Sequence, residues 1–94
     1  MIVVLLSYKV DLAEIDRLRP AHVDWLKAGL AKGRVLMAGR KVPVTGGMFL
    51  ARGSLDEVTA WAATDPFATA GAADYSFTEI APSLFAPGLE ALGE

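Results

Sequence analysis

Residues 34–52 read RVLMAGRKVPVTGGMFLAR, and this central segment predicts a pair of antiparallel strands. Residues 34–39 and 48–52 are short apolar runs, and Thr45-Gly46-Gly47 lies between them. We expect a hairpin in which glycine supplies positive φ at the turn. The segments before and after this hairpin must then supply the remaining strands and helices.

Before the hairpin, residues 2–6 read IVVLL and predict a strand that is buried on both faces. A helical pattern follows from residue 12 to residue 32. Proline suits the first turn of a helix and disrupts its interior. We therefore expect the main helix to begin at Pro20 and to end near Ala31, before a C-cap at Gly33.

After the hairpin, Ser54-Leu55-Asp56-Glu57 has the form of a capping box and predicts the start of a second helix. This helix must end by Asp65, because Pro66 disfavours helical geometry in the residue before it. The alternating segment 75–80 predicts a fourth strand.

The predicted order is strand, helix, strand, strand, helix, strand, which is typical of an α+β, ferredoxin-like βαββαβ fold. It has a four-stranded antiparallel sheet with two helices on one face. We expect one domain over residues 1–94, with a core at 1–82 and a C-terminal tail at 83–94. The other sheet face would be an apolar patch of roughly several hundred Å². A second copy of the chain is the simplest cover, which predicts a homodimer; the alternative cover is the tail.

Composition excludes several classes of function. The chain has nine Lys and Arg against eleven Asp and Glu, so no basic surplus favours nucleic acid. It has no cysteine, which fits a cytoplasmic location, and its N-terminal apolar run is too short for a signal peptide or a membrane span. A single histidine makes a transition-metal site improbable, and no glycine-rich loop indicates a nucleotide cofactor.

The single histidine, His22, lies on the apolar stripe of the first helix, and Asp65 falls on the apolar face of the second. Since both helices cover the same sheet face, we expect the two side chains to meet. A carboxylate that holds imidazole Nδ1–H would leave Nε2 as a general base. Each residue also has a structural interpretation, His22 as a core histidine and Asp65 as a turn cap. No serine or threonine lies in a nucleophile elbow, although Ser7, Thr45 and Ser76 are available.

Several segments together carry a family resemblance: residues 19–26 (RPAHVDWL), residues 34–39 (RVLMAG), residues 64–67 (TDPF) and residues 70–75 (AGAADY). The chain resembles the YCII-related family over residues 1 to about 82. This resemblance implies a dimeric α+β barrel of ferredoxin-like protomers with a His-Asp site, carried here by His22 and Asp65. It implies no settled reaction.

The chain departs from the family pattern where Gly39-Arg40-Lys41 replaces the common Gly-Pro. Arg40 is either a solvated charge or a clamp for a substrate carboxylate or enolate oxygen. Phe67 is either a pocket wall or a packing residue of its loop. Trp25 and Trp61 are expected as core anchors.

These observations favour a small enzyme that needs no cofactor and uses the His22-Asp65 dyad for elimination or isomerisation of a small aromatic or carboxylated substrate. The alternative is a non-catalytic module of the same fold that binds a small molecule or a partner.

Overall fold

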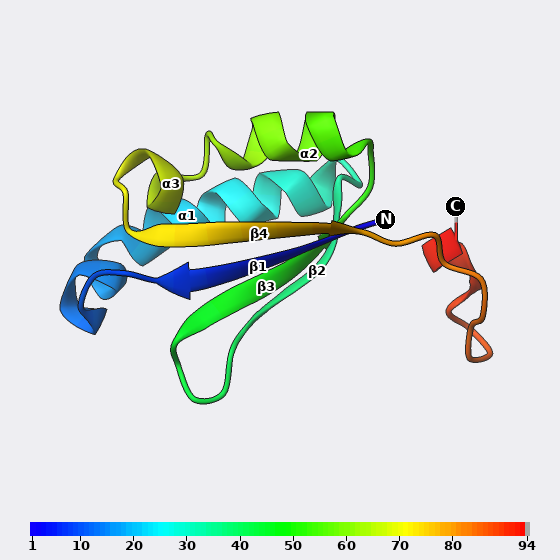
Figure 1. Cartoon of the computed structure of the whole chain (residues 1–94), viewed down its shortest axis with the longest axis horizontal. Coiled ribbons are helices and arrows are strands. Elements are labelled where there is room, and N and C mark those ends of the chain that lie inside the picture. Colours follow the sequence, from blue (N-terminus) through cyan, green and yellow to red (C-terminus); the bar gives the residue numbers. More distant parts are fainter. Residues whose placement is uncertain (94) are drawn as a thin grey trace.

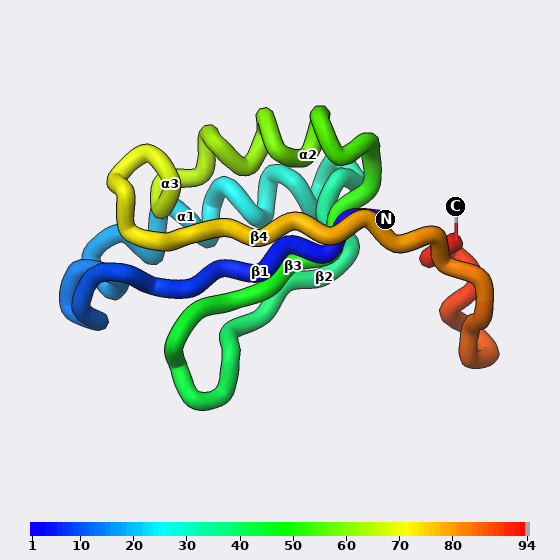
Figure 2. Tube along the Cα trace, viewed as in Figure 1, coloured from blue at the N-terminus to red at the C-terminus, as the bar shows by residue number. Residues whose placement is uncertain are grey.

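The computed structural model describes residues 1–93 (Figures 1 and 2). Along the chain the elements are β1 (Ile2–Tyr8), α1 (Leu12–Ala31), β2 (Val35–Arg40), β3 (Gly46–Ala51), α2 (Leu55–Ala62), α3 (Pro66–Thr69), β4 (Ala73–Glu79) and the 3-10 helix η1 (Glu90–Gly93). Apart from α3 and η1, this is the predicted order of strands and helices.

The four strands form one antiparallel sheet in the order β2-β3-β1-β4. Figure 1 shows α1 and α2 on the same side of this sheet. The predicted ferredoxin-like α+β fold is therefore confirmed. The capping box is confirmed as well, since the Ser54 hydroxyl accepts from the Glu57 amide and the Glu57 carboxylate accepts from the Ser54 amide.

Strand β1 forms the centre of the core. Ile2, Val4 and Leu6 point toward the helices and are at most 2% exposed. Burial of each such side chain stabilises the fold by about 1.5–3 kcal/mol. Leu5 points to the other face and is 41% exposed, so the expectation that this strand is buried on both faces is wrong for the single chain. The helices cover only one side.

Helix α1 is longer than predicted and contains Pro20 in its interior. It begins after Asp11, whose side chain accepts from the Glu14 amide, and its first half adds Ile15 to the core. Pro20 lies on the exposed side of α1, where water can reach backbone groups that lack a helical partner. Packing of the residues before Pro20 therefore outweighs the preference of proline for the first turn of a helix.

No helix within residues 1–93 is long and apolar enough to cross a membrane.

The hairpin turn also differs from the prediction. Gly46 and Gly47 belong to β3, neither has positive φ, and residues 41–45 form the connection instead. Gly46 is needed for a different reason: a Cβ atom there would lie 1.8 Å from the Leu6 carbonyl oxygen. The glycine permits close approach of β3 to β1, which local sequence did not reveal.

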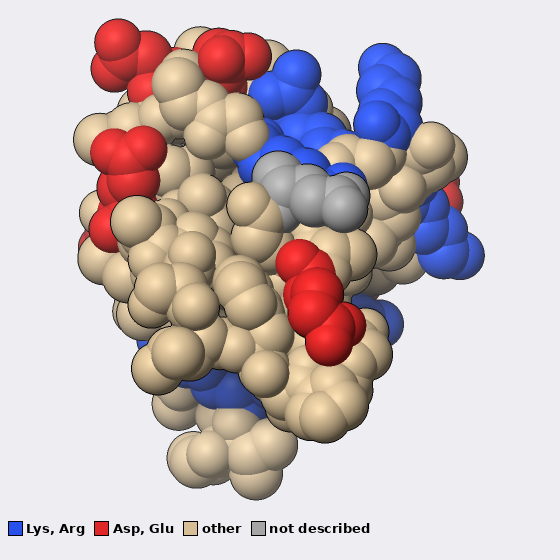
Figure 3. Space-filling model, turned by 90° about the vertical axis from the view of Figure 1, so that its right-hand side faces the viewer, with Lys and Arg blue, Asp and Glu red and all other residues tan. Residues whose placement is uncertain are grey.

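The C-terminal tail extends past one end of the sheet in Figure 1 and does not cover the open sheet face. Arg52 donates a hydrogen bond to the Ala91 carbonyl at 3.0 Å, which attaches η1 to the end of β3. Figure 3 faces this end and shows uncharged surface between separate basic and acidic groups. Leu84 in the tail is 93% exposed, so the tail is not the cover considered from the sequence.

Candidate functional site

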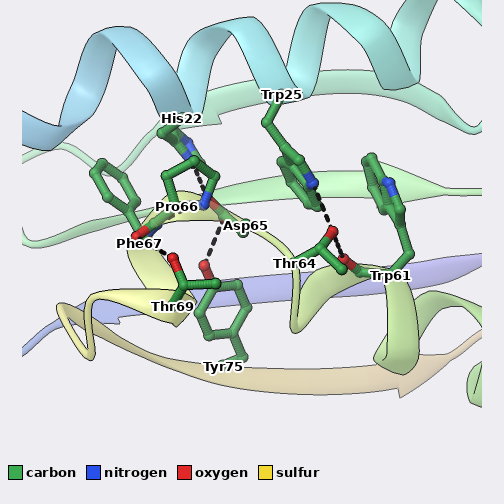
Figure 4. Close-up of polar contacts among 9 residues, drawn as sticks. All are labelled: His22, Trp25, Trp61, Thr64, Asp65, Pro66, Phe67, Thr69 and Tyr75. Carbon is green, nitrogen blue, oxygen red and sulfur yellow. Dashed lines mark hydrogen bonds and ion pairs between the residues drawn. The ribbon is translucent and has the colours of Figure 1, made fainter.

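The structure brings His22 and Asp65 together, as the sequence predicted. His22 lies on α1, Asp65 lies between α2 and α3, and His22 Nδ1 is 2.7 Å from Asp65 Oδ1 (Figure 4). The His22 side chain is 12% exposed, whereas that of Asp65 is 0% exposed. The contact joins α1 to the segment that follows α2.

Asp65 is a buried carboxylate surrounded by hydrogen-bond donors. Its Oδ1 accepts from the Phe67 amide at 3.0 Å, and its Oδ2 accepts from the Tyr75 hydroxyl at 2.5 Å. A buried carboxylate is costly unless it is paired and hydrogen-bonded. Because an ionised carboxylate only accepts, Nδ1 of His22 must carry the proton in their contact. Nε2 is then the ring nitrogen left for chemistry.

Asp65 also caps the short helix α3. Pro66 occupies its first turn, and the contact from the Phe67 amide to Asp65 satisfies a free N-terminal donor. From the sequence, Asp65 is either a partner of His22 or a turn cap, but in the structure its carboxylate makes both contacts. Asp65 followed by Pro66 is itself a helix-start signal, so α3 could have been predicted.

Tyr75 is the site residue that the sequence did not single out. It pairs with Leu6 across β4 and β1, which directs its side chain toward the helices and Asp65. Burial, the hydrogen bond to Asp65 and the charge of Asp65 all raise the pKa of Tyr75 far above its usual range. Tyr75 therefore remains a neutral donor to the carboxylate.

The ring of Phe67 packs against the imidazole of His22. Its ring stacks on His22 with centroids 4.0 Å apart and an interplanar angle of 13°. Phe67 is 1% exposed and does not line the cleft beside His22. The structure thus favours the packing interpretation over the predicted pocket wall, because the ring is covered by His22.

A second contact between α1 and the end of α2 runs beside the dyad (Figure 4). Trp25 Nε1 donates to the Thr64 hydroxyl at 3.0 Å, and that hydroxyl donates to the Trp61 carbonyl at 2.6 Å. The two indole rings stack with centroids 3.8 Å apart and pack against the core, as expected of anchors. Because Thr64 directly precedes Asp65 in the chain, these hydrogen bonds help to position the Asp65 carboxylate relative to His22.

A cleft of about 260 Å³ lies between α1 and β2, and His22 forms part of its wall. Apolar side chains from α1, including Val23 and Leu26, line it together with three basic residues, Arg19, Lys27 and Arg40. Arg40 Nη2 is 3.9 Å from Asp16 Oδ1, a long contact for an ion pair. The structure therefore places Arg40 beside the same cleft as His22.

The candidate nucleophiles lie elsewhere. Ser7 and Ser76 occupy strand positions that face away from the helices, in register with Gly46 and Leu5. The Ser7 hydroxyl accepts from Lys41 at 3.3 Å. Thr45 lies in the exposed hairpin connection. None of the three is placed to attack a substrate held beside His22.

Within residues 1–93, no three His, Cys, Asp or Glu side chains gather as metal ligands would.

Comparison with known proteins places the chain in a family. No curated protein matches the chain in sequence. Among solved structures, the chain is similar to 5-chloro-2-hydroxyhydroquinone dehydrochlorinase from Burkholderia phenoliruptrix AC1100, solved with 2,5-dihydroxybenzoquinone. The identity is 20%, the TM-score is 0.67, and the match covers 85% of this chain and 93% of that one. The family model of the YCII-related domain matches residues 1–81. The chain therefore belongs to the YCII-related domain family.

Proposed function

We propose that this chain is a small cytoplasmic enzyme that catalyses elimination or isomerisation by proton transfer, without a cofactor. The observation that carries the proposal is the fully buried Asp65 carboxylate on Nδ1 of His22, a residue that also lines the cleft. A carboxylate in this position orients the imidazole and stabilises the imidazolium that forms when Nε2 takes a proton.

The proposed reaction begins when Nε2 of His22 removes a proton from a carbon or hydroxyl of the substrate. The negative charge moves onto a substrate oxygen, where the guanidinium of Arg40 stabilises it. In an elimination the leaving group then departs, whereas in an isomerisation His22 returns the proton to another atom. Asp65, held by Tyr75 and the Phe67 amide, keeps its charge opposite the imidazolium.

The structural neighbour supports the choice of reaction class. Its name describes a dehydrochlorination of a chlorinated hydroquinone, which is an elimination on a small aromatic compound. The cleft of this chain, with an apolar wall and basic residues, suits a substrate of that size and kind.

The test is incubation of the protein with a panel of chlorinated hydroquinones, with chloride and proton release as the readout. We expect His22→Gln to lower the rate by at least about 10²-fold, because glutamine cannot accept the proton. Arg17→Gln, on the same helix but outside the cleft, is the matched control and should keep the rate. Equal rates in the wild type and His22→Gln, or no release from any compound, would refute elimination with His22 as the base.

A further inference from the structure

We propose that the cleft binds a planar organic anion, and that Arg19 and Lys27 act with Arg40 as its charge-recognising residues. The inference rests on the proposed function for its view of the cleft as a substrate site. It narrows the substrate class to an aromatic or unsaturated compound that carries a carboxylate or enolate, and it assigns two further binding residues.

The first observation is the local charge. The whole chain has a net charge of −2, yet three of its nine Lys and Arg line this one cleft. No Asp or Glu is among the residues that line it. Like charges gathered around an apolar cavity repel one another and create a positive potential in it. An anion in the cleft relieves that repulsion.

The second observation is the placement of the charges around an apolar wall. Arg19, Val23 and Lys27 recur every four residues on one side of α1, so the cations flank the apolar side chain. Arg40 approaches from β2 on the other side of the cleft. An apolar ring can lie against Val23 while an anionic group on the ring reaches a guanidinium. The planar fork of arginine suits a carboxylate.

The third observation is that Asp16 of the chain itself competes with an anion for Arg40. Asp16 lies 3.9 Å from Arg40 and is 70% exposed, so this contact is weak and open to exchange. Asp16 and Asp24 do not line the cleft itself but an adjoining groove, which shares Arg19, Val23 and Lys27 with the cleft. A substrate anion would replace Asp16 as the partner of Arg40. Removal of the Asp16 charge should therefore tighten binding of the anion.

The experiment compares two probes of nearly the same shape, salicylate and its neutral amide salicylamide, by NMR titration of the folded protein without turnover. We expect salicylate to bind more tightly, with an affinity that falls as ionic strength rises. Arg40→Gln should weaken salicylate binding about five- to tenfold, and Arg19→Gln and Lys27→Gln about two- to fivefold each. Asp16→Asn should tighten it about twofold.

Arg17→Gln is the matched control, since it removes the same charge from α1 outside the cleft, and it should leave both affinities unchanged. Equal affinity for the two probes, no binding of either at millimolar concentration, or an equal loss in Arg17→Gln would overturn the inference. These outcomes are separate from the chloride-release test. Anion binding without His22-dependent turnover would refute the catalytic proposal alone, and turnover without charge selectivity would refute this inference alone.

Discussion

At the scale of single residues, the site depends on how the two oxygens of Asp65 are shared. Oδ1 serves His22 and the Phe67 amide, and Oδ2 serves the Tyr75 hydroxyl. An asparagine has only one oxygen, so its amide group would have to face one of these donors. Asparagine that keeps its oxygen toward His22 and Phe67 places its NH₂ group against Tyr75.

Asp65→Asn should therefore keep the fold but impair both stability and turnover. We expect a loss of about 1–3 kcal/mol in the free energy of unfolding, because a buried donor loses its acceptor. Turnover should fall at least about 10²-fold, because a neutral amide cannot stabilise the imidazolium. Chemical denaturation and chloride release measure the two effects.

Tyr75→Phe in the Asp65→Asn background is the control for this prediction. In this background, Tyr75→Phe should lower the free energy of unfolding by less than it does in the wild type, since the Tyr75 hydroxyl has already lost its acceptor. Equal costs in both backgrounds would show that the Tyr75 hydroxyl does not depend on the Asp65 carboxylate.

The raised pKa of Tyr75 predicts a loss of stability at alkaline pH. In the unfolded chain a tyrosine ionises near its ordinary pKa of 10.0, whereas folded Tyr75 stays neutral to higher pH. The stabilising contribution of its hydroxyl is thus fully present below about pH 10 and declines as the pH rises further. The difference in unfolding free energy between the wild type and Tyr75→Phe should narrow above that pH. A constant difference across the alkaline range would contradict the assignment.

Part of this site could be predicted from the sequence. The contact between His22 and Asp65 was predicted, but the placement of Asp65 on the second helix was wrong, because α2 ends at Ala62 and Asp65 caps α3. Tyr75 was not recovered, because its contact with Asp65 depends on the register of β4 against β1. The role of Phe67 was left open for a similar reason, since stacking behind the imidazole requires the geometry of α3.

At the scale of elements, a feature set by local sequence was predicted correctly, whereas features set by tertiary contacts were not. The capping box of α2 was predicted because its partners lie three residues apart. The predicted start of α1 at Pro20 was wrong, because packing of Ile15 and the cap at Asp11 outweigh the effect of Pro20 on the helix. The role of Gly46 could not be predicted, since the atom that excludes a side chain belongs to β1.

Substitution of two glycines in the β2-β3 hairpin tests this account of the sheet. Gly46→Ala should destabilise the fold by more than about 3 kcal/mol, because its Cβ would overlap the Leu6 carbonyl. Gly39→Ala is the matched control, since a Cβ there meets nothing within 4 Å, and it should change stability by less than about 0.5 kcal/mol. Thermal unfolding followed by circular dichroism compares the two. Similar melting temperatures would refute the close approach of β3 to β1.

At the scale of the whole molecule, the open sheet face predicts association. Five apolar side chains of β1, β2 and β3 point away from the helices and are only partly covered in the single chain: Val3, Leu5, Met37, Met48 and Leu50. Leu5 and Met37 remain 41% and 46% exposed. We propose that a second copy covers this face, as the family resemblance implies.

Light scattering should therefore give about twice the chain mass of 9.9 kDa. Leu5→Lys should shift the protein toward the monomer, because it places a charge in the apolar interface. Val42→Lys, in a hairpin connection where Val42 is 96% exposed, should leave the dimer intact. A wild-type mass equal to one chain would refute the dimer.

The central claim is that Asp65 fixes the proton of His22 on Nδ1 and leaves Nε2 free to act as a base. Because His22 is the only histidine, nitrogen-15 NMR of the imidazole tests this claim without ambiguity of assignment. At a pH where the ring is neutral, we predict a protonated Nδ1 with a coupled hydrogen and an unprotonated Nε2. A neutral ring that carries its proton on Nε2 would contradict the claim, since that nitrogen could then donate a proton but not accept one.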